Sequence, residues 1–393
     1  MSNEINKVII LVETTFNGRD YKRFGVDILL KNGFDVHVID FCALLHLKFY
    51  ETIEIYDIVE YANYRCVKNI SDVTSELNKF TRNSFIINFL QFNLNTYKVY
   101  RLISKYTIPY AVLGWPPVLF YEYLKNENIS VLDNIRRKIR NFRLSKIQHY
   151  LLAYLPISLL GLKPARYVFC STLKSDIRIK VVDKSTEIVM IHAFDYDNYL
   201  DSLKMVVEYT NTIVFLDQNL PLHSDHIIHP SNNIPTPDDY YPHLCRAFDR
   251  IEIIFKAKII ISCHPRANRA LLDDYYNGRE VVIGETNDVV RKSLFCIAHY
   301  SMSISYAVLY KKPIIFITTN SIEKSELGYK IIKCASYFKQ RVINISKNFS
   351  LDIKKDLYFD DDIYKQYMTD YIKSKNSSDE KYWNVVSDII KAI

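Results

Sequence analysis

Short apolar runs that do not alternate with polar residues constrain this chain more than any other feature. The first run, residues 8–12, is rich in β-branched side chains and leads through a polar loop to a helix-like segment at 21–30. A second apolar run follows at 36–41. Such strands are typical of parallel sheets, because helices cover both faces and bury every side chain. The pattern predicts an α/β domain with further strands at 85–89, 110–113 and 167–170.

The second half of the chain begins the same pattern again. Six apolar runs alternate with helix-like segments, at 187–192, 213–216, 258–262, 281–283, 295–298 and 313–318. Because 393 residues exceed the size of one ordinary core, we expect two doubly wound, Rossmann-like domains. We place the first at 1–180 and the second at 181–375, with the boundary in the charged stretch 174–185. A helix in the last segment, 376–393, could pack back on the first domain.

Glycine usage and charge exclude several classes of protein. Only 8 glycines occur, and neither a G-x-G-x-x-G nor a G-x-x-x-x-G-K-[ST] string is present, which argues against a dinucleotide fingerprint and a P-loop. The net charge of +7 is modest and spread along the chain. It favours an acidic substrate or a membrane surface and is too small to indicate a nucleic-acid partner.

Cysteine usage and hydropathy indicate the compartment. Seven cysteines occur without a C-x-x-C string, so we expect reduced thiols and a cytoplasmic protein. The N-terminus passes directly into a strand and lacks signal-peptide features, and no run of 18 apolar residues predicts a membrane span. A basic stretch from Arg136 to Lys146, followed by the apolar run 150–162, could make peripheral contact with the inner face of a membrane. The alternative is a solvated helix followed by core.

A histidine, a proline and an arginine follow the apolar run 259–262, in the string Cys263-His264-Pro265-Arg266. In open α/β sheets, ligands bind beyond the carboxyl ends of the strands. There His264 and Arg266 could bind a phosphate together with the N-terminus of the following helix, and Pro265 would fix where the histidine points. An ordinary turn at the end of a strand is the alternative.

A second strand end carries a histidine and two serines. The apolar run 295–298 leads into His299-Tyr300-Ser301-Met302-Ser303 and then into a helix-like segment. Hydroxyls at the start of a helix cap its free N–H groups, and together with those groups they also bind phosphate oxygens. Capping is the alternative for either serine. Two such strand ends in one domain nevertheless favour a phosphate-binding site.

A carboxylate stands at a third strand end, where the apolar run 213–216 is followed by Asp217. A carboxylate at such a place can act as a general base that deprotonates a hydroxyl, or as a nucleophile. Asp217 is therefore the candidate catalytic residue of the second domain. The alternative is that Asp217 caps a turn.

The first domain contains residues that could bind or activate a second substrate. The loop after its first strand contains Glu13, a second candidate catalytic carboxylate, and Arg19, which could bind an acidic group. The alternative is a helix-capping loop in which Asn17 or Asp20 is the cap. Trp115 follows another predicted strand and could stack on a sugar, or it could lie in a plain turn.

These residues together resemble a known group of enzymes. A strand ending in His264-Pro265, a later strand leading to Ser301 and Ser303, and an upstream acid, Asp217, are similar to motifs of bacterial GT-B transferases that use CMP-activated acid sugars. That group includes sialyltransferases and Kdo transferases, and the resemblance covers about the second half of the chain. It implies a GT-B fold, in which two Rossmann-like domains face a cleft. It also implies that the histidine and the hydroxyls hold the CMP phosphate without a metal ion.

The resemblance implies a glycosyltransferase that moves a Kdo- or sialic-acid-like sugar from its CMP donor to a surface glycan or glycolipid. Arg266 and His299 would also hold the leaving phosphate, and the nucleotide sugar would be a substrate, so no cofactor is expected. Two alternatives stay open: a GT-B transferase that uses a UDP- or GDP-sugar or CDP-glycerol, and a non-catalytic glycan- or nucleotide-binding assembly protein. It also stays open whether Asp217 is a base in an inverting reaction or a nucleophile in a retaining one.

Overall fold

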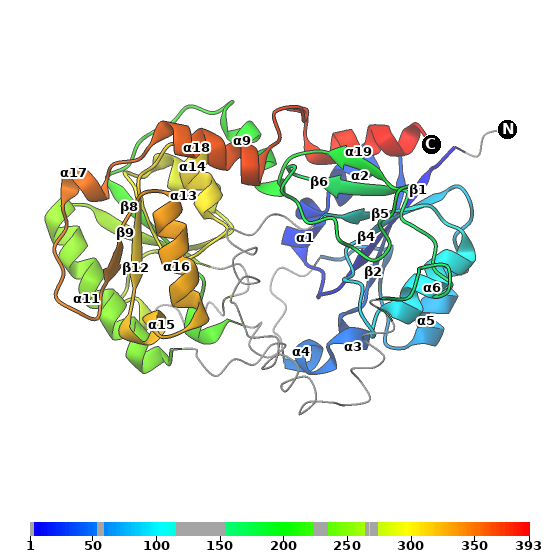
Figure 1. Ribbon diagram of the computed structural model, residues 1–393, viewed down its shortest axis with the longest axis horizontal. Coiled ribbons are helices and arrows are strands. Elements are labelled where there is room, and N and C mark those ends of the chain that lie inside the picture. Colours follow the sequence, from blue (N-terminus) through cyan, green and yellow to red (C-terminus); the bar gives the residue numbers. More distant parts are fainter. Residues whose placement is uncertain are drawn as a thin grey trace. The chain divides into compact units, whose positions relative to one another are not determined.

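The computed structural model describes residues 4–52, 59–114, 152, 154–223, 235–263, 267 and 274–393. The chain forms two compact units: unit 1 comprises Met1–His192 and Asn376–Ile393, and unit 2 comprises Ala193–Lys375. Each unit is built around its own sheet (Figure 1). Within the described ranges, no helix is both long enough and apolar enough to cross a membrane.

Unit 1 contains a seven-stranded sheet in the order β3-β2-β1-β4-β5-β6-β7, with every neighbouring pair parallel. The central strands β1 and β4 are buried along nearly their whole length, as their apolar sequences predict. The strands are β1 Lys7–Val12, β2 Asp35–Asp40, β3 Tyr64–Cys66, β4 Ser84–Asn88, β5 Tyr110–Leu113, β6 Tyr167–Cys170 and β7 Glu187–Met190.

Helices cover both faces of this sheet. Figure 1 shows α2 and α19 on one side and α5 and α6 on the other. The described helices of unit 1 are α1 Gly18–Arg23, α2 Val26–Lys31, α3 Cys42–Leu45, α4 Leu47–Thr52, α5 Ile70–Leu77, α6 Tyr97–Tyr106 and α19 Tyr382–Lys391.

Unit 2 contains a six-stranded parallel sheet in the order β10-β9-β8-β11-β12-β13. Its strands are β8 Thr212–Leu216, β9 Lys258–Cys263, β10 Val281–Ile283, β11 Cys296–Ala298, β12 Ile314–Thr318 and β13 Val342–Asn344. Two doubly wound α/β domains were the expected fold class, and this prediction is confirmed.

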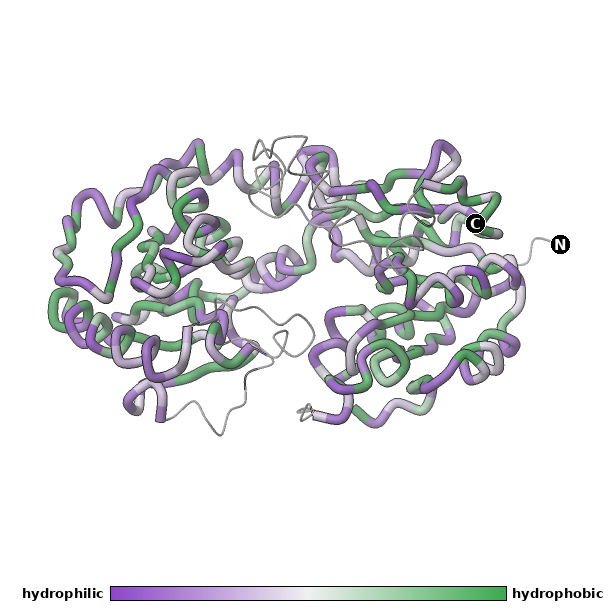
Figure 2. The backbone as a smooth tube through the Cα atoms, turned by 60° about the horizontal axis from the view of Figure 1, so that its bottom comes forward, coloured by the Kyte–Doolittle hydropathy of each residue, from purple (hydrophilic) through white to green (hydrophobic). Residues whose placement is uncertain are grey.

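The helices of unit 2 likewise lie on both faces, with α11 on one side and α13 and α14 on the other (Figure 1). Figure 2 shows hydrophobic strand segments inside both units and more hydrophilic segments around them. The described helices are α9 Phe194–Ser202, η2 Leu220–Leu222, α11 Pro237–Phe255, α13 Thr286–Lys292, α14 Ile304–Leu309, α15 Asn320–Glu323, α16 Glu326–Tyr337, α17 Ile353–Asp356, α18 Asp361–Tyr367 and η3 Met368–Ile372.

In each sheet, the chain adds strands first on one side of the central strand and then on the other. In unit 1 the chain adds β2 and β3 on one side of β1, and then β4 to β7 on the other. In unit 2 it adds β9 and β10 on one side of β8, and then β11 to β13 on the other. The loops that follow the two central strands therefore diverge, at β1/β4 and at β8/β11. Such switch points are where open α/β sheets bind ligands.

The division between the units lies after the position expected from sequence. The run 187–192 was expected to open the second domain, but β7 pairs with β6 and forms the edge of the first sheet. Unit 1 accordingly extends to His192 instead of ending at 180. An apolar strand sequence does not specify which of two sheets it joins, so the charged stretch before β7 was a misleading guide.

The C-terminal helix α19 belongs to unit 1 and contacts α2. Trp383, only 1% exposed, lies against Gly25 and donates its indole N–H to the Arg23 carbonyl at 2.8 Å. Gly25 has a φ of +63°, and a Cβ at this position would come within 2.0 Å of Trp383. Glycine is required here both for the left-handed backbone and for the close approach of the indole.

Candidate functional site

The switch point of unit 2 joins the loops that follow β8 and β11. Gln218, two residues after β8, accepts a hydrogen bond from the Tyr300 N–H at 3.0 Å, two residues after β11. Gln218 and Tyr300 are both partly exposed. This bond fixes the entrance to the loop that carries Ser301 and Ser303. The predicted residues of both strand ends are therefore brought together at one edge of the sheet.

Asp217 lies at this edge but turns inward, with only 4% of its surface exposed. One carboxylate oxygen accepts from the Asn219 N–H at 2.9 Å, and the other accepts from the Cys263 thiol at 3.1 Å. Burial raises the pKa of Asp217, and these hydrogen bonds oppose that shift. The turn it closes places Asn219 in the left-handed region, with a φ of +51°. In this arrangement Asp217 organises the loop, as the turn-capping alternative supposes.

Three buried polar atoms next to Asp217 have no hydrogen-bond partner in the described part of the chain. They are the hydroxyls of Tyr241 and Tyr276 and the Oδ1 atom of Asn219. The Tyr276 hydroxyl is near enough to lower the pKa of Asp217, but it does not meet hydrogen-bond geometry. Buried polar atoms nearly always have a partner, which can be water or a ligand. This cluster therefore has unused hydrogen-bonding capacity.

His299 is fully buried, and both ring nitrogens are used inside the protein. Its Nδ1 atom lies 2.7 Å from the Ile317 carbonyl, which can only accept, so Nδ1 carries the proton. Its Nε2 atom then accepts from the Tyr240 hydroxyl at 2.9 Å. Burial lowers the pKa of His299 to about 4, so the ring is neutral at pH 7. His299 thus connects β11, β12 and α11, and it offers no nitrogen to a phosphate.

Ser301 and Ser303 are partly exposed beyond the end of β11. The Ser301 hydroxyl accepts from the Ser303 N–H at 3.2 Å. Ser303 precedes α14, but its side chain makes no capping hydrogen bond to that helix. The capping alternative therefore does not describe Ser303. Of the described donor-binding candidates, Ser301 and Ser303 are partly exposed, whereas His299 is buried.

The switch point of unit 1 is organised by Glu13, whose side chain is 20% exposed. One carboxylate oxygen lies 3.0 Å from His46 Nε2, and the other accepts from the Gln91 N–H at 3.0 Å. Glu13 therefore connects the loops after β1 and β4 with the end of α3. A carboxylate that orients a histidine in this way is a common arrangement for general acid–base work.

A second carboxylate in unit 1, Asp40 at the end of β2, is completely buried. It accepts from the N–H groups of Phe16 and Cys42 at 3.2 and 2.7 Å and from the Tyr64 hydroxyl at 2.8 Å. Burial raises the pKa of Asp40, and these bonds oppose the shift. Asp40 shapes the loop that carries Glu13.

Arg19, the predicted acceptor-binding cation, is exposed on α1 and lies 3.9 Å from Asp20. Asn17 caps α1 by accepting from the Asp20 N–H at 3.1 Å, as the helix-capping alternative supposes. Capping by Asn17 and exposure of Arg19 are compatible, because they involve different groups of the same loop.

In unit 2, Asp195 and Asp197 both lie in the first turn of α9, where Asp195 accepts a hydrogen bond from the Tyr306 hydroxyl.

Several predicted residues lie outside the described residues: His264, Pro265, Arg266, Trp115 and the basic stretch from Arg136 to Lys146. The strand that leads to His264 is described, and its last residue, Cys263, contacts Asp217. Among the side chains that the structure describes, no three His, Cys, Asp or Glu residues converge as metal ligands would.

Sequence analysis did not single out Gln218, Tyr241, Tyr276 or His46. The tyrosines are hard to distinguish in a chain with 31 of them, and only the fold brings α11 next to the segment after β9. Gln218 adjoins Asp217, but a strand-end glutamine is not a distinctive signal. Its position as the second residue after the predicted strand 213–216 is the signal that could have identified it.

Comparison with known proteins shows the fold. No family model and no curated protein matches the sequence. Two structures of the wall teichoic acid polymerase TagF, one of them a variant, match 99% of this chain and 90% and 89% of their own chains. Their TM-scores are 0.50 and 0.52, with 14% and 12% identity. UDP-GlcNAc 2-epimerase from Methanocaldococcus jannaschii matches 98% of this chain and 100% of its own at a TM-score of 0.47 and 11% identity. The chain has the GT-B type of fold, as predicted.

Proposed function

We propose that this chain is a transferase that takes a nucleotide-activated donor at the β8/β11 switch point of unit 2. We further propose that the donor is a nucleoside diphosphate derivative, either a UDP- or GDP-sugar or CDP-glycerol, and that the acceptor belongs to a surface polymer. The observation that carries this proposal is the match of nearly the whole chain to a wall teichoic acid polymerase at a TM-score of 0.52. The partly exposed serines beyond β11 supply the local chemistry.

A CMP-sugar donor has weaker support. That hypothesis relied on Asp217 as the catalytic carboxylate, either base or nucleophile, and on His299 among the phosphate ligands. Asp217 is buried and bonded to Cys263, and both nitrogens of His299 are occupied. The features that remain, Ser301, Ser303 and the β11 loop, suit a phosphate group of any nucleotide donor. They therefore favour the broader donor class.

For the acceptor, we propose Glu13 and His46 at the switch point of unit 1. Their contact at 3.0 Å would allow the pair to remove a proton from an acceptor hydroxyl. With a sugar donor, the acceptor oxygen bonds to the anomeric carbon, the bond to the diphosphate oxygen breaks, and the nucleoside diphosphate leaves. With CDP-glycerol, the acceptor oxygen attacks the phosphorus that carries glycerol, and CMP leaves.

The test is a panel of nucleotides and donors. Calorimetry with CMP, CDP, UDP and GDP measures affinity, and chromatography measures loss of CDP-glycerol, UDP-GlcNAc or a CMP-sugar in the presence of protein. We expect a diphosphate nucleotide to bind more tightly than CMP, and the corresponding donor to turn over. Because CMP is released from CDP-glycerol and from CMP-sugars alike, consumption of the donor, and not the released nucleotide, decides the class.

Paired variants locate the site. Replacing both Ser301 and Ser303 with alanine should weaken binding of the preferred nucleotide at least tenfold, because each hydroxyl bond to a charged phosphate contributes roughly 1.5–3 kcal/mol. The matched control replaces the exposed serines Ser71 and Ser350, which lie away from both switch points. Preference for CMP would restore the CMP-sugar hypothesis. Binding without turnover of any donor would favour a non-catalytic assembly protein.

A further inference from the structure

A groove with a volume of about 610 Å³ lies in unit 1 along α6. Its walls are the exposed face of α6, the segment 161–163 and the start of α5. The opposite face of α6 carries the buried residues Val99 and Ile103, which belong to the core of unit 1. The groove is thus outside the sheet core, and its size is within the usual range for small-molecule sites, roughly 300–1,000 Å³.

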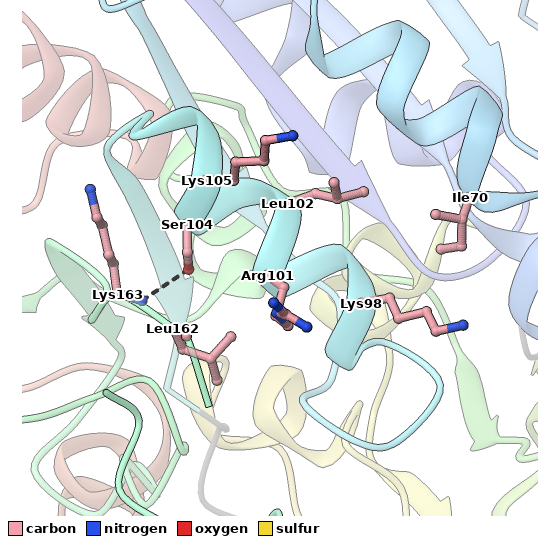
Figure 3. Close-up of a pocket in the computed structure, with 9 residues that line it drawn as sticks. Ile70, Lys98, Arg101, Leu102, Ser104, Lys105, Leu162 and Lys163 are labelled. Carbon is pink, nitrogen blue, oxygen red and sulfur yellow. Dashed lines mark hydrogen bonds between the residues drawn. The ribbon is translucent and has the colours of Figure 1, made fainter. Parts of the chain in front are cut away.

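Four cationic side chains line this groove. Lys98, Arg101 and Lys105 lie three and four residues apart on α6, so they share one helix face. The fourth, Lys163, is fixed by its backbone N–H, which donates to the buried Ser104 hydroxyl at 2.9 Å. In Figure 3, Lys98 and Lys105 extend toward the side of α6 on which Ile70 lies, Lys163 is on the other side, and the Arg101 guanidinium lies between them.

No carboxylate balances these charges. The groove lining contains no acidic residue, and none of the four cations forms an ion pair within the described part of the chain. Elsewhere the chain pairs its surface cations often, as in Lys79 with Glu76 and Lys330 with Glu326. Like charges held along one groove without a counter-charge create a positive potential that attracts anions.

The rest of the lining is apolar. Ile70, Leu102 and Leu162 contribute to the walls. Gly161, with a φ of +68°, brings bare backbone beside Arg101, and a Cβ at that position would lie 3.6 Å from Arg101 Nε. The site therefore offers both a planar donor for phosphate oxygens and an apolar surface.

We propose that the α6 groove binds an organic phosphate, a ligand in which at least one phosphate group is joined to an apolar part. Arg101 and the neighbouring lysines hold the phosphate, and the leucines contact the apolar part. Such chemistry is found both in phospholipid headgroups at a membrane surface and in soluble phosphorylated compounds. The residues that line the groove all belong to unit 1, whereas the donor site proposed at β8/β11 is built from residues of unit 2.

Binding is tested on the full chain with two probes. Inorganic pyrophosphate represents a soluble phosphate, and vesicles of phosphatidylcholine with about one third phosphatidylglycerol represent anionic headgroups. The test variant is the double substitution Arg101→Gln and Lys105→Gln. The control, Lys31→Gln with Lys48→Gln, removes the same charge from exposed positions of unit 1 outside the groove. Circular dichroism checks that both variants remain folded.

We expect at least tenfold weaker binding of one probe in the groove variant and less than twofold change in the control, because two charge-assisted contacts are lost. Loss confined to pyrophosphate assigns a soluble ligand, and loss confined to vesicles assigns a headgroup. Pyrophosphate could also bind at the donor site. The weaker pyrophosphate binding of the groove variant must therefore also be seen when Ser301 and Ser303 are both replaced with alanine. Equal weakening in the groove variant and the control, or no binding of either probe, would overturn the proposal.

Discussion

The two switch points of this protein are built alike. In each, a side chain from the loop after the first central strand accepts a backbone N–H from the loop across the reversal: Glu13 from Gln91 in unit 1, and Gln218 from Tyr300 in unit 2. Each also buries an aspartate whose pKa is raised by burial, Asp40 in unit 1 and Asp217 in unit 2. The same topology has selected the same kind of internal support.

The clusters around the two buried aspartates differ in how completely their polar groups are paired, although the Asn88 Nδ2 atom at the end of β4 is also without a partner in the described residues. Asp40 accepts three bonds, and the Tyr64 hydroxyl beside it is used. Near Asp217, the hydroxyls of Tyr241 and Tyr276 have no partner in the described residues. A fully paired cluster fixes a loop, whereas an incompletely paired one retains groups that water or a ligand can satisfy. Among the described residues, the Asp217 cluster is therefore the less completely paired of the two aspartate clusters.

The largest expected effect separates the two aspartates. Asp40→Ala leaves two buried N–H groups and one partly buried hydroxyl unpaired, which should lower the free energy of unfolding by roughly 3–5 kcal/mol. Asp217→Ala leaves one N–H and one weak thiol donor unpaired, so we expect the free energy of unfolding to fall by roughly 1–3 kcal/mol. Both tryptophans of the chain lie in unit 1. Urea unfolding followed by tryptophan fluorescence should therefore respond to Asp40→Ala and not to Asp217→Ala.

Far-UV circular dichroism, which reports both units, should respond to both variants. The exposed Asp27→Ala, in the first turn of α2, is the control and should cost less than about 1 kcal/mol. If Asp217→Ala shifts the fluorescence transition as far as Asp40→Ala does, the two clusters do not act independently.

A second expected effect is a change of stability at acidic pH. The pKa of His299 falls from 6.5 to about 4, so unfolded chains bind more protons than folded ones between these values. The stability that His299 contributes is therefore present above pH 6.5 and is lost as the pH falls toward 4, a change of about 3 kcal/mol. The raised pKa of Asp217 acts in the opposite sense, because its contribution is lost as the pH rises.

His299→Gln isolates the histidine, because glutamine keeps one donor for Ile317 and one acceptor for Tyr240. Urea midpoints at pH 7 and pH 4.5, measured by circular dichroism, should fall less in the variant than in the parent protein. An identical pH dependence in both proteins would show that His299 does not titrate as its burial requires.

A third effect has opposite signs in the two units. Tyr64→Phe removes a hydroxyl that Asp40 uses, so it should destabilise unit 1 by about 1–2 kcal/mol. Tyr276→Phe removes a buried hydroxyl that has no partner among the described residues, so it should be neutral or stabilising by up to about 1 kcal/mol. If a bound nucleotide uses that hydroxyl, Tyr276→Phe should weaken nucleotide binding while it leaves the stability of the free protein unchanged. Destabilisation by Tyr276→Phe in the free protein would instead indicate a resident water.

Much of the fold was predictable, because apolar runs without alternation specify parallel strands wherever they occur. The predicted strands at 8–12, 258–262 and 295–298 lie within one residue of β1, β9 and β11. The edge strand β7 was assigned to the wrong sheet, since pairing depends on contacts that its own sequence does not encode. Local pattern thus predicts elements better than it predicts their partners.

The place of the candidate site residues at the edge of the sheet was predictable, but the orientation of their side chains was not. Strand ends identified Asp217, His299 and Ser303 because the topology places such residues at one edge. Whether a side chain then points out or in depends on neighbours: Cys263 holds Asp217 inward, and Tyr240 with Ile317 holds His299. Those neighbours come from other strands and from α11, which the local sequence does not reveal.

The smallest expected effect tests the bond that the two switch points share. Gln218→Ala removes the acceptor for the Tyr300 N–H, which is partly exposed and can bond to water, so stability should fall by only about 0.5–1.5 kcal/mol. Glu13→Ala should cost a similar amount in unit 1. If the β8/β11 edge binds the donor, Gln218→Ala should also weaken nucleotide binding several-fold in calorimetry, because the loop carrying Ser301 and Ser303 loses a hydrogen bond that fixes it. Glu13→Ala should leave the nucleotide affinity unchanged. Equal losses of affinity in the two variants would mean that the resemblance of the switch points extends to ligand binding, and that incomplete pairing in unit 2 does not identify the donor site.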